Sequence, residues 1–263
     1  MDGFQLYEHY RNIGMILAEA EAAEKHAHLF HENQYQEILE KQIIKCLDAS
    51  PHHRVVDLGA GSCAFASRLA KSMHLKHPIL CVDDSAAILH LEHERKHIET
   101  LNIDPVEFAR KDLAYDRLYV LGAVHHFGVD HLPDIFSGIF RHLSADGKLV
   151  VEKPDKEFMD LPLFDKALAE LNKMDIMPTK DFITLLTKAG FKHFKIIKFR
   201  FTFRTSKNWI FEKIRERAFL CLGSFTHEEI EEGIRELEKK WQGMDEITFT
   251  PEKDIIVADK TEN

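Results

Sequence analysis

The sequence predicts an α/β fold in which a mostly parallel sheet carries helices on both faces. Apolar, β-branched segments alternate with amphipathic helical segments between residues 54 and 152, which is the order of successive β-α-β units. The hydrophobic period changes from strand to helix at a glycine-bearing turn, residues 59–61. The hydrophobic content of 44% is that of a packed globular protein.

The first expected element is an N-terminal helical cap, residues 1–50. It contains two helices between residues 4 and 48, and Ser50-Pro51 ends the second. Strands and helices then alternate. The expected strands are 54–58, 79–83, 106–109, 116–121 and 147–152, and the expected helices are 63–73, 85–101 and 131–143.

The rest of the chain follows Lys153-Pro154 and is more helical. We expect a helix at 179–190 that ends on a glycine, a strand at 193–203 and two amphipathic helices within 207–242. Residues 247–250 and 254–259 close the chain, the latter as the last strand. The expected second domain is therefore 51–263, with a helical lid inserted at about 204–244.

Composition restricts the classes of partner. A net charge of -9 and a pI near 6.0 disfavour a broad nucleic-acid surface. The four cysteines have no spacing typical of a metal site, so we expect no metal and reduced, partly buried thiols. The N-terminus has no signal-peptide pattern and no segment has the roughly 20 apolar residues of a membrane span. We expect a soluble, cytoplasmic protein.

The turn at residues 59–61 has the chemistry of a ligand cradle. Glycine permits positive φ and lets a ligand approach the backbone, and the N–H groups of the following helix can receive an electronegative group. Asp83 follows about 20 residues later, at the end of the next strand, where a carboxylate can bind ribose hydroxyls; Asp84 is the alternative. Dinucleotide-binding folds use the same spacing, so an NAD-dependent oxidoreductase remains possible.

The chain resembles the class I, Rossmann-like methyltransferases that use S-adenosylmethionine, in particular those that act on small molecules. Six segments carry this resemblance, in the order typical of the family. They are Asp57-Leu-Gly-Ala-Gly-Ser-Cys63, Cys81-Val-Asp-Asp-Ser85, Asp112 in the segment 108–113, the segment 116–127 with its histidine pair, the segment 143–152, and Ala189-Gly-Phe191. Cys63 stands where the family usually has its last glycine.

The resemblance implies a doubly wound sheet of seven strands, mostly parallel, with the last strand antiparallel. It also implies S-adenosylmethionine as cofactor and S-adenosylhomocysteine as product. The cofactor-binding residues that it implies are Asp57, Gly59, Ala60, Gly61, Asp83, Asp84, Ser85, Asp112, Leu113 and Leu121.

The expected reaction moves a methyl group to an oxygen or nitrogen atom of a small acceptor. Alignment in a water-poor site supplies much of the acceleration of such an in-line displacement, and a base is optional. His125 and His126 follow the fourth strand and are the candidate catalytic residues. The candidate acceptor-binding residues are Tyr7, Tyr10, Tyr35, His126, Trp209 and Arg217. The expected assembly is a monomer or homodimer.

Three alternatives remain open from the sequence. An NAD-dependent enzyme is disfavoured because Asp57 precedes the glycines, although Ala64 is a permitted last position of the dinucleotide motif. A protein methyltransferase needs an open acidic groove in place of a covered pocket. A catalytically silent protein that binds the cofactor and serves as an interaction subunit is indicated only by Cys63.

Overall fold

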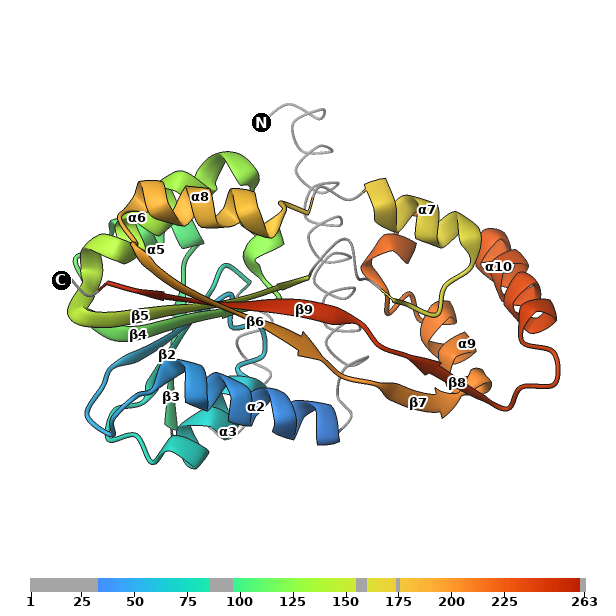
Figure 1. The fold of residues 1–263 in the computed structure, drawn as a ribbon, viewed down its shortest axis with the longest axis horizontal. Coiled ribbons are helices and arrows are strands. Elements are labelled where there is room, and N and C mark those ends of the chain that lie inside the picture. The colour runs from blue at the N-terminus through green and yellow to red at the C-terminus, as the bar shows by residue number, and fades with distance from the viewer. Residues whose placement is uncertain (1–32, 86–96, 155–159, 174–175, 261–263) are drawn as a thin grey trace, which may run out of the picture. The chain divides into compact units, whose positions relative to one another are not determined.

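The computed structural model describes residues 33–85, 97–154, 160–173 and 176–260 (Figure 1). These residues form two compact units. The sheet unit contains residues from 37 to 154, 176–200 and 252–260. The ribbon unit contains residues 33–36, 160–173 and 201–251.

Seven strands of the sheet unit form one sheet, in the order β3-β2-β1-β4-β5-β9-β6. The first five in the chain are parallel, and β9 is antiparallel to both of its neighbours. This confirms the mostly parallel sheet with an antiparallel last strand. The strands are β1 (Val55–Leu58), β2 (Ile79–Asp83), β3 (Ile98–Asn102), β4 (Tyr115–Leu121), β5 (Leu143–Pro154), β6 (His193–Arg200) and β9 (Glu252–Asp259).

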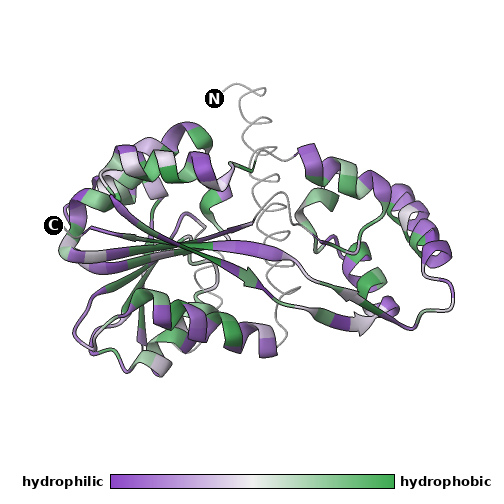
Figure 2. Ribbon diagram, in the orientation of Figure 1, coloured by the Kyte–Doolittle hydropathy of each residue, from purple (hydrophilic) through white to green (hydrophobic). Residues whose placement is uncertain are grey.

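Helices cover both faces of this sheet (Figure 1). One face carries α5 (Pro105–Arg110), α6 (Leu132–His142) and α8 (Thr179–Ala189), and the other carries α2 (Asn33–Leu47) and α3 (Ala64–Met73). The helices turn apolar residues toward the sheet (Figure 2), because an amphipathic helix buries one stripe. The core of the first face includes Phe136, Phe182, Leu118, Val151 and Ile256.

The prediction of a strand at 106–109 is wrong. Those residues belong to α5, and the strand β3 lies earlier, at Ile98–Asn102, in a segment expected to be helical. The Asp104 carboxylate accepts hydrogen bonds from the backbone N–H groups of Val106 (2.8 Å) and Glu107 (2.9 Å), and Pro105 occupies the first turn. This aspartate-proline pair is a helix-start signal that outweighs the β-branched Val106. Residues 86–96 of the expected helix 85–101 lie outside the described residues.

The ribbon unit pairs two short strands and adds helices. The strand expected at 193–203 ends at Arg200, and Phe203 begins a second strand that pairs with residues 246–249. Thr226 and Glu229 form a capping box at the start of the last helix. The elements are α7 (Asp165–Lys173), β7 (Phe203–Ser206), α9 (Lys207–Arg215), the 3-10 turn η5 (Leu220–Leu222), α10 (His227–Lys240) and β8 (Glu246–Phe249).

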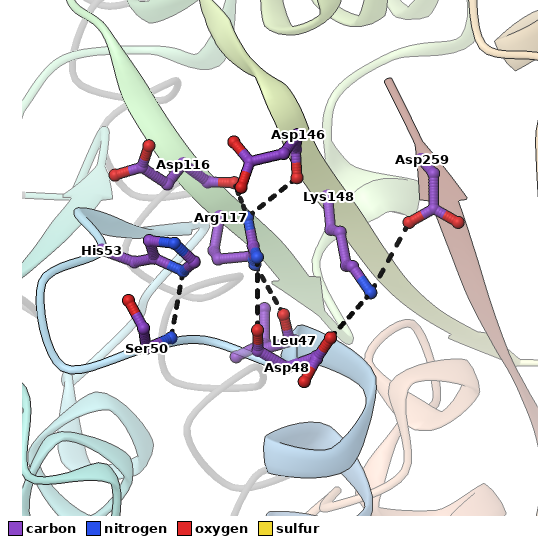
Figure 3. A network of polar contacts seen from close by, with 9 residues as sticks. All are labelled: Leu47, Asp48, Ser50, His53, Asp116, Arg117, Asp146, Lys148 and Asp259. Atoms are coloured by element: carbon purple, nitrogen blue, oxygen red, sulfur yellow. Dashed lines mark hydrogen bonds and ion pairs between the residues drawn. The ribbon is translucent and has the colours of Figure 1, made fainter. Parts of the chain in front are cut away.

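Arg117, near the start of β4, ties the end of α2 to the sheet (Figure 3). Its Nε donates to the Leu47 carbonyl (2.6 Å), and Nη2 donates to the Asp48 carbonyl (3.2 Å). Nη1 donates to the carbonyls of Asp116 (2.9 Å) and Asp146 (3.1 Å). The residue is only 3% exposed. Arg117 therefore satisfies helix-end carbonyls that would otherwise be buried without partners.

The cysteines agree with the sequence-based expectation, since all four are free and buried. In the described part of the chain, no three His, Cys, Asp or Glu side chains gather as a metal site would require. No helix built from these described residues has the length and apolar character needed to cross a membrane.

Candidate functional site

The turn that follows β1 is held against the end of β2. The N–H groups of Gly59 and Ala60 both donate to the Val82 carbonyl, at 2.8 and 3.1 Å. Gly59 has a φ of 77°, and a Cβ on it would lie 2.4 Å from the Cβ of Ala123. Glycine is therefore required here by packing against the segment after β4 as well as by its backbone conformation.

Asp83, the last residue of β2, contacts this turn directly. Its Oδ2 accepts a hydrogen bond from Gly61 N, and its Oδ1 accepts one from Ser85 N, both at 2.9 Å. The Asn102 side chain donates to the Asp83 carbonyl at 2.9 Å. Since each carboxylate oxygen has a second lone pair, the half-buried Asp83 can still accept hydrogen bonds from a ligand. The structure thus brings together the turn and the carboxylate that the sequence predicts.

Asp57 lies beneath the turn, inside the sheet. It is 3% exposed and pairs in register with Tyr119 of β4. Burial raises the pKa of the Asp57 carboxyl to about 8, the neighbouring Tyr119 hydroxyl acts in the opposite direction, and the charge of Asp83 adds to the rise. Burial therefore favours the protonated form of Asp57.

Cys63 occupies a left-handed conformation, with φ 63° and ψ 7°, at the start of α3. This explains why a glycine is usual there, since side chains are strained in that region. The side chain is fully buried, and its Sγ lies 3.7 Å from the Gly61 carbonyl oxygen. A hydrogen bond that the Cys81 thiol on β2 donates to the Cys63 sulfur, together with burial, raises the pKa of Cys81. The Cys63 sulfur is thus directed into the protein.

The acidic residue at the end of β3 is Asp104, which the sequence analysis missed. Burial and then the charge of Asp83 raise the pKa of the exposed Asp84, and Asp104 contributes in the same direction. Asp112 is exposed and lies after α5, in the connection to β4, where Leu113 packs against the core. The signal that could have identified Asp104 is its position before a proline.

The two candidate histidines form the 3-10 turn η2 (Val124–His126), just after β4 ends at Leu121. Their ring centroids are 3.9 Å apart and the rings are tilted by 44°. His126 is exposed and His125 is half-buried. His126 also acts electrostatically on Asp84, lowering that carboxyl's pKa against the larger effect of burial. The histidine pair therefore lies at the same edge of the sheet as the turn.

The expected acceptor-binding residues have different surroundings. Tyr35 is buried, with its ring centroid 5.4 Å from that of Phe201 in the ribbon unit. Trp209 is half-buried in α9, and Arg217 donates to the Phe225 carbonyl at 3.0 Å. The side chains of Tyr35 and Arg217 thus make contacts within the protein. Tyr7 and Tyr10 lie outside the described residues.

Comparison with known proteins agrees with this geometry. Residues 55–147 match a family described as a methyltransferase domain. A search among curated proteins found no match.

Solved structures with the same fold share little sequence with this chain. A putative methyltransferase from an antibiotic biosynthesis pathway of Anabaena variabilis is similar with a TM-score of 0.64 and 18% identity, over 84% of this chain and 96% of that one. A putative methyltransferase of Bacillus halodurans has a TM-score of 0.60 and 15% identity, over 85% and 99%. Phosphoethanolamine N-methyltransferase 2 of Haemonchus contortus, solved with S-adenosylhomocysteine, has a TM-score of 0.55 and 16% identity, over 85% and 52%.

Proposed function

We propose that this chain, whose residues 55–147 match a family described as a methyltransferase domain, transfers the methyl group of S-adenosylmethionine to an oxygen or nitrogen atom of a small acceptor. The observation that carries the proposal is the hydrogen bond from Gly61 N to Asp83 Oδ2. It places a glycine turn, a helix start and a carboxylate at the carboxyl edge of the sheet, where ligands of such folds bind.

The residues at this edge fit the parts of that cofactor. The hydroxyls of a ribose suit the remaining lone pairs of Asp83. The turn at residues 59–61 offers backbone groups to the amino acid end. For the adenine amino group we assign Asp104 in preference to Asp112, because Asp104 follows β3 directly and Asp112 follows α5. Leu121 ends β4 beside the turn and offers an apolar contact.

The bound cofactor would supply a methyl group activated by a sulfonium. The residues of this chain align the acceptor and exclude water, which accounts for much of the acceleration of a displacement. An acceptor that must lose a proton needs a base near neutral pKa, and His126 is the more accessible of the two histidines. His125, half-buried against it, orients the His126 ring.

Calorimetry with S-adenosylhomocysteine tests this function, and NAD serves as the competing ligand. Asp83→Ala should weaken the affinity for S-adenosylhomocysteine at least tenfold, about 1.4 kcal/mol. Asp84→Ala is the matched control and should leave the affinity within twofold of wild type. The pair Asp104→Ala and Asp112→Ala distinguishes the two adenine assignments in the same way.

Absence of S-adenosylhomocysteine binding would refute the proposal, and binding of NAD alone would replace it with an oxidoreductase. If Asp83→Ala binds S-adenosylhomocysteine with normal affinity while Asp84→Ala does not, the ribose contact is assigned to Asp84.

A further inference from the structure

A buried ion pair lies next to the proposed cofactor site, between β5 and β9. Glu152 is 1% exposed, and its Oε1 lies 2.5 Å from the Nζ of Lys253. Glu152 is in register with Ile255, so Lys253, two residues earlier on β9, extends from the same face of the sheet. Burying such a pair costs desolvation that its mutual attraction barely repays. The pair is therefore weak evidence for stability.

The second oxygen of Glu152 lies beside Gly122. A Cβ built on Gly122 would meet only Glu152 Oε2, at 3.7 Å, among the described residues. Gly122 itself is exposed. At Gly59 the same construction runs into Ala123 at 2.4 Å. Gly59 is thus enclosed by protein, whereas Gly122 leaves room that a carboxylate borders.

The order of the strands places Gly122 and Glu152 on the side of the turn opposite to Asp83. The proposed cofactor extends from Asp83, at the end of β2, across the turn after β1. Next along the same edge come β4 and β5, whose ends carry Gly122 and Glu152. The backbone N–H of Gly122 donates to the Glu152 carbonyl at 3.4 Å, so the two residues are held together.

We propose that Glu152 recognises the methyl acceptor, that Lys253 positions its carboxylate, and that the acceptor is a small amine. This inference rests on the proposed function. A carboxylate only accepts hydrogen bonds, so its partner must be a donor. Asp83, Asp84 and Asp104 add negative charge along the same edge, which favours a protonated amine over a carboxylate or a neutral hydroxyl.

The chemistry balances for such an acceptor. The bound ammonium first gives one proton to His126 or to water. The nitrogen lone pair then forms the N–C bond while the S–C bond breaks. The electron pair of the S–C bond returns to sulfur. Glu152 holds a remaining N–H group and so directs the lone pair toward the methyl group.

The test measures binding of small probes to the full-length protein saturated with S-adenosylhomocysteine. The probes are matched in size: 2-phenylethylamine, 2-phenylethanol and phenylacetate, and ethanolamine, ethylene glycol and glycolate. Calorimetry should show tighter binding of the amine than of its matched alcohol and acid. Glu152→Gln should weaken amine binding at least tenfold.

Glu252→Gln is the matched control, because Glu252 is a buried, ion-paired glutamate that extends from the opposite face of β9, where it contacts Lys198 at 3.3 Å. It should leave the amine preference unchanged. Lys253→Met should reduce the preference for the amine over its matched alcohol and acid. Lys253→Arg keeps the positive charge and should preserve this preference.

Equal binding of alcohols or acids, absence of amine binding, or equal losses in Glu152→Gln and Glu252→Gln would each overturn the inference. The affinity of every variant for S-adenosylhomocysteine is measured separately. If the wild type does not bind S-adenosylhomocysteine, the proposed function fails. If it binds S-adenosylhomocysteine but shows no preference for the amine, only this inference fails.

Discussion

At the amino edge of the seven-stranded sheet the guanidinium of Arg117 donates to four main-chain carbonyls, whereas the carboxyl of Asp57, toward the carboxyl end of β1, is buried beneath the turn, and its residue pairs in register with Tyr119. Both groups are 3% exposed. The first donates four hydrogen bonds from its five N–H groups. Burial raises the pKa of the second.

This difference separates stability from function in one sheet. Fully paired buried charges hold elements together, since leaving their partners unpaired is costly. Buried acids with a raised pKa near the ends of parallel strands lower stability once they ionise and are typical of ligand sites. The two edges should therefore respond to substitution with opposite signs.

The largest expected effect is at the amino edge. Arg117→Ala should lower the free energy of unfolding by about 3–5 kcal/mol, because it leaves the buried carbonyl of Leu47 without a donor and removes the bond to the Asp48 carbonyl. Thermal and urea denaturation measure this. Arg110→Ala, at an exposed position, should change stability by less than about 0.5 kcal/mol. A loss no larger than in this control would contradict the role assigned to Arg117.

Asp57→Asn should instead stabilise the protein, by roughly 2–4 kcal/mol at pH 8. The folded-state pKa of Asp57, about 8, lies above its ordinary value of 3.8. The contribution of Asp57 to the free energy of unfolding is therefore fully present below about pH 4 and is lost as pH rises toward 8, because unfolding then releases the proton of this carboxyl. The variant lacks this titration. Urea denaturation from pH 4 to 8 should show curves that diverge with pH; parallel curves would show that Asp57 is ionised in the folded state.

Gly59→Ala should cost about 1–3 kcal/mol more than Gly243→Ala. The two glycines have nearly equal φ, 77° and 79°, so backbone strain is matched. Only at Gly59 would the new Cβ meet another atom at short range, the Cβ of Ala123. Gly59→Ala should also weaken binding of S-adenosylhomocysteine. Equal losses of stability would show that the turn can move away from Ala123.

The smallest effect is expected at Cys63. Cys63→Gly removes left-handed strain but also a fully buried sulfur, so the net change should be below about 1 kcal/mol. Cys63→Ala keeps the strain and loses the sulfur, and should be less stable than Cys63→Gly. Affinity for S-adenosylhomocysteine should stay within twofold in both variants. A marked gain in Cys63→Gly would mean that the cysteine narrows the cofactor site.

The residues around the turn show how far sequence reasoning reached. The segment from Asp57 to Cys63 was predicted as a strand, a turn and a helix, and it has that structure because its signals are local: β-branched residues, glycines and a helical period. Asp104 and Asp112 show the limit. Both are acidic residues near a strand, and only the true position of β3 distinguishes them. The β-branched Val106 outweighed the helix-start signal in the sequence-based prediction.

The sequence by itself determined the alternation of strands and helices, the methyltransferase-like motifs and the pairing of a glycine turn with a later aspartate, because each depends on residues close together in the chain. Only the tertiary structure decided which carboxylate lies beside Gly122, where the Cys63 sulfur points, and that Glu152 meets Lys253 across about 100 residues of chain. The physical reason is that burial and pairing depend on neighbours contributed by other strands. No local pattern in the sequence specifies those neighbours.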